Sequence, residues 1–133
     1  MRNLKLANWV KISSKEPIIE KFLELETINN VKANLTLQTE DFIAEVDLGS
    51  IITLKGFTES QKIEVKNKSF YDAFNFKSKK TFIEAKASQA AIYVSGFLDA
   101  EAKLKAEITY MGNPFSVNEK TFLGKIIPKK EEK

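Results

Sequence analysis

The sequence contains no cysteine and no histidine among its 133 residues. Without cysteine, disulfides and thiolate metal sites are excluded. Without histidine, the chain lacks the usual general base near neutral pH and the commonest metal ligand, and it cannot build a Ser–His or Cys–His nucleophile system by itself. These absences predict a protein that is not an enzyme and that holds no metal or cofactor.

Arginine and long apolar runs are also scarce. Of the 21 basic residues only Arg2 is arginine, which disfavours sequence-specific DNA reading because bidentate contacts to bases favour arginine. No apolar run approaches the roughly 18 residues that cross a bilayer, so we expect no membrane span. Residues 1–10 show no signal peptide. The expected localisation is therefore cytoplasmic or in a virion.

The strongest positive pattern is the alternation of apolar and polar residues, typical of strands with one buried face. The alternation is clearest over residues 31–39, 41–48 and 101–111. Further strands are expected at 4–12, 51–57, 62–67, 81–87, 91–98 and 122–127. Eight or nine closely spaced strands predict a mainly β fold, an antiparallel β-sandwich or barrel. The short link between 91–98 and 101–111 predicts a hairpin.

One short α-helix is expected near residues 17–26, because Pro17 suits a first helical turn and apolar residues follow at helical spacing. No internal repeat is evident, so residues 1–128 are expected to form a single domain, followed by an exposed charged tail at 129–133. The five glycines are isolated, which excludes phosphate-binding loops. Gly56 and Gly96 lie inside expected strands and indicate bulges or close backbone approaches.

Residues 62–86 combine lysines with aromatic rings. Single-stranded nucleic-acid binders use this mixture, with cations for the backbone and ring faces for the bases. The candidate residues are Lys66, Lys68, Tyr71, Phe74, Lys77, Lys79 and Lys80. The alternative, which we favour, is a solvated lysine face with phenylalanine in the core, because buried phenylalanine is common in β proteins.

Three aromatic residues, Trp9, Tyr93 and Phe97, lie on otherwise polar faces of expected strands. Outward aromatic side chains mark a subunit interface or a ligand platform. The same pattern also arises in a strand that is buried on both faces, and the sequence does not separate these alternatives. If the three side chains are exposed, a protein interface is the better interpretation.

The leading functional hypothesis is a non-enzymatic structural or assembly protein, a β-domain subunit of a larger complex such as a phage or virus particle. Its partners would be other protein subunits, in a homo-oligomer or a larger assembly, since unprotected edge strands pair with other chains. The alternative is a non-specific module for single-stranded nucleic acid. A small barrel that binds a hydrophobic ligand ranks third.

Overall fold

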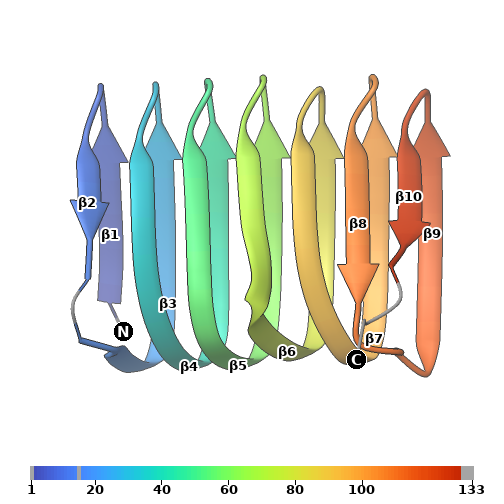
Figure 1. Cartoon of the computed structure of the whole chain (residues 1–133), viewed down its shortest axis with the longest axis horizontal. Coiled ribbons are helices and arrows are strands. Elements are labelled where there is room, and N and C mark those ends of the chain that lie inside the picture. Colours follow the sequence, from blue (N-terminus) through green and yellow to red (C-terminus); the bar gives the residue numbers. More distant parts are fainter. Residues whose placement is uncertain (1, 15, 130–133) are drawn as a thin grey trace.

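The computed structural model describes residues 2–14 and 16–129. These residues form a parallel β-solenoid in which the chain winds through about seven coils, each lying beside the next (Figure 1). Within the described residues there are ten strands: β1 (Arg2–Ala7), β2 (Lys11–Ser13), β3 (Ile18–Ile28), β4 (Lys32–Asp47), β5 (Ile51–Lys66), β6 (Phe70–Lys86), β7 (Gln89–Lys103), β8 (Glu107–Met111), β9 (Ser116–Phe122) and β10 (Lys125–Pro128).

The expected antiparallel sandwich or barrel is wrong, because neighbouring strands pair in parallel throughout the described residues. The expected hairpin is also wrong: β7 runs straight through Asp99 and Ala100, and the chain turns later, at Leu104 and Lys105. Alternation determines which side chains are buried, but it carries no information on the direction of the partner strand. The described residues fill the interior of the solenoid with side chains and form no barrel around a hydrophobic ligand.

The expected helix at 17–26 is replaced by β3. Leu23, Leu25 and Thr27 are buried in strict alternation, and Glu24 and Glu26 between them face outward. β3 pairs with β1 on one side and with β4 on the other, so its backbone hydrogen bonds are made on both sides. Tertiary pairing of this kind overrides a weak local helical preference.

Each coil is flattened into two layers, because the long strands β4 to β7 bend near their middle (Figure 1). At the bend two consecutive residues point away from the core, as at Glu40 and Asp41 in β4 and at Lys79 and Lys80 in β6. Polar residues also occur together at 58–60 and 78–80, and they lie at such bends within continuous strands. The first half of each of these long strands lies in one layer and the second half in the other.

Opposite the bends, the layers are joined by tight turns built on left-handed residues. Asn29 and Asn30 both have positive φ, as do Asn67 and Lys68. Asparagine tolerates this conformation better than most residues. The turns stack on one another: the Lys68 amide donates to the Ala87 carbonyl of the next coil over 2.8 Å.

A column of buried serines follows these turns. Ser50, Ser69 and Ser88 occur at intervals of 19 residues, and each seryl hydroxyl accepts a hydrogen bond from the preceding coil. The Ser50 amide donates to Ser69 Oγ, and the Ser69 amide donates to Ser88 Oγ, both over 3.2 Å. The chain thus has a structural repeat, although no internal repeat was expected from the sequence, because most equivalent core positions share only their apolar character.

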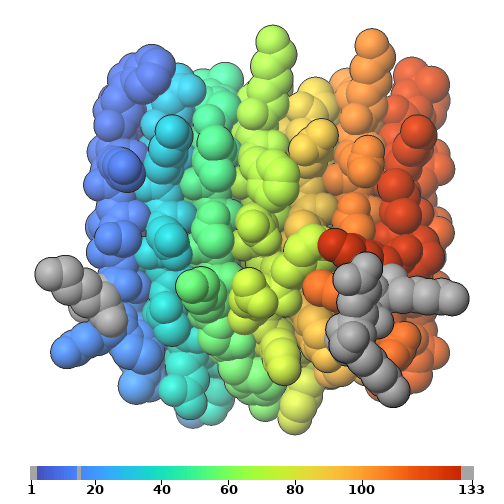
Figure 2. All heavy atoms as spheres, in the orientation of Figure 1, coloured from blue at the N-terminus to red at the C-terminus, as the bar shows by residue number. Residues whose placement is uncertain are grey.

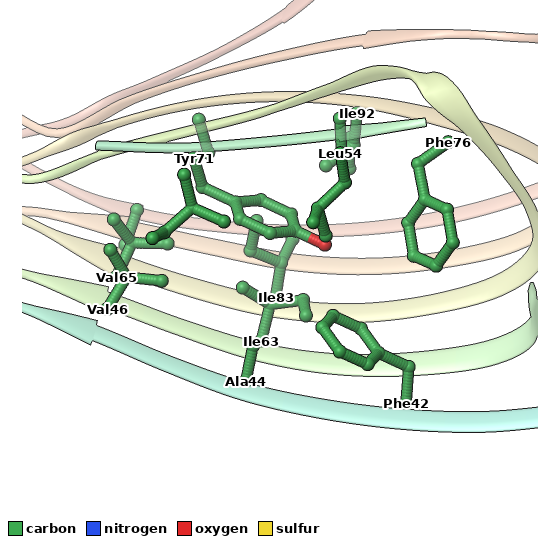
Figure 3. Close-up of a cluster of buried hydrophobic side chains, with 14 of the residues drawn as sticks. Phe42, Ala44, Val46, Leu54, Ile63, Val65, Tyr71, Phe76, Ile83 and Ile92 are labelled. Atoms are coloured by element: carbon green, nitrogen blue, oxygen red, sulfur yellow. The ribbon is translucent and has the colours of Figure 1, made fainter. Parts of the chain in front are cut away.

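The core lies between the two layers, where inward side chains from successive coils stack on one another (Figure 3). Phe42 and Phe76 pack edge to face, with ring centroids 5.5 Å apart. Tyr71 is fully buried among aliphatic side chains, and its hydroxyl donates to Gln61 Oε1 over 2.6 Å. Gln61 Nε2 in turn donates to Thr81 Oγ1 over 3.1 Å, so the polar groups at this end of the core satisfy one another.

Two glycines confirm the expected close backbone approaches. A Cβ on Gly56 would collide with the Leu37 carbonyl oxygen of the preceding coil, and its φ of +120° disfavours any side chain. A Cβ on Gly96 would lie 2.6 Å from the Lys79 carbonyl oxygen. In the described part of the chain no helix is long and apolar enough to cross a membrane. The expected tail at 129–133 lies outside the described residues, except for Lys129.

Candidate binding face

One outer layer carries a straight row of glutamates. The second halves of β3 to β7 each place one glutamate at the same register position: Glu26, Glu45, Glu64, Glu84 and Glu101. Because paired strands lie roughly 4.8 Å apart, these carboxylates follow one another along the solenoid axis. We call these five residues the glutamate row. The space-filling view shows the coils side by side in the order of the sequence (Figure 2).

Lysines beside the row relieve the repulsion between like charges. Lys66 Nζ lies 2.8 Å from Glu64 Oε1 and 3.1 Å from Glu45 Oε1, and these two hydrogen bonds raise the pKa of Lys66 well above its ordinary value. Lys103 Nζ lies 2.8 Å from Glu101 Oε1, and this contact raises the pKa of Lys103 in the same direction. At the end of the row Lys5 Nζ lies 4.0 Å from Glu26 Oε2, so lysines partly neutralise the row.

A shallow groove of about 340 Å³ runs along the other side of the glutamate row. Its walls are outward side chains of two adjacent rows, and its floor is the backbone between them. The groove is lined by Ile43, Ala44, Glu45, Lys62, Ile63, Glu64, Phe82, Ile83, Glu84, Asp99 and Glu101. Phe82 is 40% exposed and packs on Phe97 with ring centroids 5.6 Å apart. Aromatic and acidic groups therefore meet at the same edge of the groove.

The three aromatic residues predicted as interface candidates lie in different places. Phe97 adjoins the groove through Phe82. Tyr93 is half-buried in the first half of β7, in the other layer, with Lys77 Nζ 5.5 Å from its ring centroid. Trp9 is 75% exposed on the turn between β1 and β2, at one end of the solenoid. The structure does not bring the three into one patch.

The candidate nucleic-acid residues are also scattered. Tyr71 is in the core and cannot stack on a base. Phe74 is half-buried, with Lys129 Nζ 5.0 Å from its ring centroid. The lysines are spread over a turn (Lys68), a bend (Lys79 and Lys80), one layer (Lys77) and the other layer (Lys66). No continuous basic and aromatic face results from these residues.

The glutamate row is the feature that reasoning from the sequence missed. The available signal was recurrence: one glutamate per coil, as between Glu45 and Glu64, which pair directly. The alternating pattern shows only which residues share a face with Glu45 within its own strand. The row becomes visible only when the register between neighbouring coils is known. Within the described residues no group of acidic side chains is arranged to hold a metal ion.

These features define a parallel β-solenoid with extended rows of side chains on flat faces, an architecture whose stacked repeats create long binding surfaces. The chain belongs to the family described as "Putative auto-transporter adhesin, head GIN domain", whose model matches residues 1–114. No curated protein and no solved structure matches significantly. Membership of an adhesin-like family contradicts two expectations from the sequence, namely a component of a virus particle and a module that binds nucleic acid.

Proposed function

We propose that the protein is a non-enzymatic, adhesin-like domain that binds another protein through the glutamate row and the groove beside it. The observation that carries this proposal is the register that aligns five carboxylates on one flat layer. The family supports an adhesin-like role. A flat, rigid face of this kind suits binding of an extended partner, because its side chains are held in place before contact.

The partner that fits this face carries basic and apolar side chains in alternation. Ammonium groups would complement the carboxylates, and apolar side chains would enter the groove beside Phe82, which is 40% exposed. Complementary charge speeds association and gives specificity, while aromatic side chains commonly supply most of the affinity. Binding should therefore weaken as salt is added, but an apolar component should remain.

A designed peptide of alternating lysine and leucine residues serves as the probe. The test variant is Phe82→Ala with Glu84→Lys, which alters the groove and the glutamate row together. The matched control is Phe70→Ala with Asp72→Lys, which removes one phenylalanine and changes the charge by the same amount, also two residues apart on β6 but in the other layer. We expect the test variant to lose about tenfold in affinity and the control to bind like the natural chain.

Binding would be measured by fluorescence anisotropy of the labelled peptide at low and moderate salt. Equal loss of affinity in the two variants would mean that the peptide responds only to the net charge of the protein and does not bind this face specifically. Absence of binding by the natural chain at low salt would overturn the assignment of this face.

A further inference from the structure

A second pocket opens on the layer that does not carry the glutamate row. It has a volume of about 220 Å³ and is lined by side chains of three neighbouring strands. β6 contributes Phe70 and Phe74, β7 contributes Ala91, and β8 contributes Glu107 and Thr109. We call these five residues the aromatic pocket.

A β-bulge in β6 determines which of its phenylalanines face outward. Between Asp72 and Asn75, β6 has one residue more than the paired stretch of β5, and the strand leaves the smooth course of its neighbours there (Figure 1). Regular alternation would place Phe74 and Phe76 on the same side. The extra residue instead turns Phe76 into the core and leaves Phe74 half-buried on the outer face. Bulges often redirect side chains in this way beside binding sites.

A small residue forms the floor of the aromatic pocket. Ala91 pairs with Asp72 on one side and with Thr109 on the other, and both neighbours point outward and are half-buried. Ala91 therefore also points outward, yet only 6% of it is exposed, because surrounding side chains cover it. A methyl group at this outward position leaves room for a ligand between the rings of β6 and the side chains of β8.

The electrostatics of the aromatic pocket favour a cation. The faces of phenylalanine rings attract positive charge. Glu107, on the opposite side, is half-buried, and among the described residues it forms no ion pair. The chain already places an ammonium group here, because Lys129 lines the pocket with its Nζ 5.0 Å from the centroid of the Phe74 ring. The Lys129 amide donates to the Tyr110 carbonyl over 2.8 Å, which fixes the backbone that carries this side chain.

We propose that the aromatic pocket binds a trimethylammonium group, which displaces the side chain of Lys129. A lysine ammonium is compact and strongly hydrated, so a ring face compensates poorly for the water it loses. A trimethylammonium group spreads the same charge over an apolar surface, and aromatic side chains are the usual partners of such groups. The pocket lies in the layer opposite the glutamate row, so this proposal does not depend on the function proposed above.

Choline is the probe, and its uncharged carbon analogue dimethylbutanol is the matched control ligand. Binding would be measured by NMR, from the shift of the Ala91 methyl signal during titration. We expect choline to bind at least about fivefold more tightly than dimethylbutanol, because only choline gains from the ring faces and the Glu107 carboxylate as a cation.

Three variants locate the site. Phe74→Leu keeps an apolar side chain but removes the ring, and it should weaken choline binding about fivefold. Phe82→Leu makes the same change on the same strand beside the glutamate row, and it should bind choline like the natural chain. Lys129→Met keeps an unbranched apolar side chain without its charge. It should bind choline about threefold more tightly, because no internal cation competes for the pocket.

Three results would overturn the proposal: dimethylbutanol that binds as tightly as choline, equal loss of choline binding in Phe74→Leu and Phe82→Leu, or no gain in Lys129→Met. Sedimentation with phosphatidylcholine vesicles then identifies the source of the trimethylammonium group. Retention of the natural chain but not of Phe74→Leu assigns the head group of a membrane lipid. Binding of free choline without retention assigns a soluble cation, and both outcomes support the pocket.

Discussion

Replacing Tyr71 by phenylalanine removes one oxygen from the core and leaves the ring in place. Tyr71 and Gln61 are both fully buried, and their side-chain oxygens lie 2.6 Å apart. Without the hydroxyl, Gln61 Oε1 loses this donor in an apolar environment. The loss of one partner of a buried hydrogen bond costs about 1–3 kcal/mol. We therefore expect Tyr71→Phe to lower the free energy of unfolding by that amount, which lowers the urea midpoint at an unchanged denaturant slope.

The same substitution changes how stability depends on pH. Burial raises the pKa of the Tyr71 phenol well above its ordinary value, whereas in the unfolded chain the phenol titrates near pH 10. Above about pH 10 the unfolded chain loses this proton first, so the free energy of unfolding falls as pH rises, by at most about 1.4 kcal/mol per pH unit. Tyr71→Phe lacks this contribution, so the difference between the two proteins should shrink above that pH.

Tyr110→Phe is the control, because Tyr110 is only half-buried. It should change the urea midpoint less than Tyr71→Phe does. If Tyr71→Phe is as stable as the natural chain near neutral pH, the hydrogen bond to Gln61 does not stabilise the core as argued. If both variants lose the same stability, burial is not the cause.

Two further substitutions test the contacts between coils. Gly56→Ala should lower the free energy of unfolding by about 2–4 kcal/mol, because the new Cβ meets the Leu37 carbonyl oxygen at a φ that disfavours side chains. A thermal melt that matches the natural chain would contradict this. Ser69→Ala should cost about 1–2 kcal/mol, because the buried Ser50 amide loses its acceptor. Hydrogen exchange of the Ser50 amide should accelerate, and unchanged exchange would refute the role of the serine column.

Much of the strand content was predictable from local pattern. Ala33, Leu35 and Leu37 alternate with polar residues and are buried as that alternation requires. Gly56 and Gly96 were predicted to lie at close backbone approaches, and they do. The prediction of a helix at 17–26 was wrong, because a few apolar residues at helical spacing also fit a strand that bends.

The candidate site was only partly predictable. Phe97 was predicted as an interface candidate, and it packs on Phe82 at the edge of the groove. The glutamate row was not predicted, because Glu45 and Glu64 are neighbours only across coils. Tyr71 was a candidate ring only under the nucleic-acid alternative, which ranked below a solvated lysine face with aromatic residues in the core, and strand pairing buries it completely.

The sequence by itself determined a β-rich chain, the core-facing side of the clearly alternating stretches, and the absence of histidine and cysteine chemistry. These properties depend on residue type and on a two-residue period, both of which are local. Only the tertiary structure decided that the strands run in parallel, that the coils stack in register, and that the row containing Glu45 and Glu64 is flanked by Lys5 and Lys120. Hydrogen bonds between residues about one coil apart decide these features, and no local period encodes them.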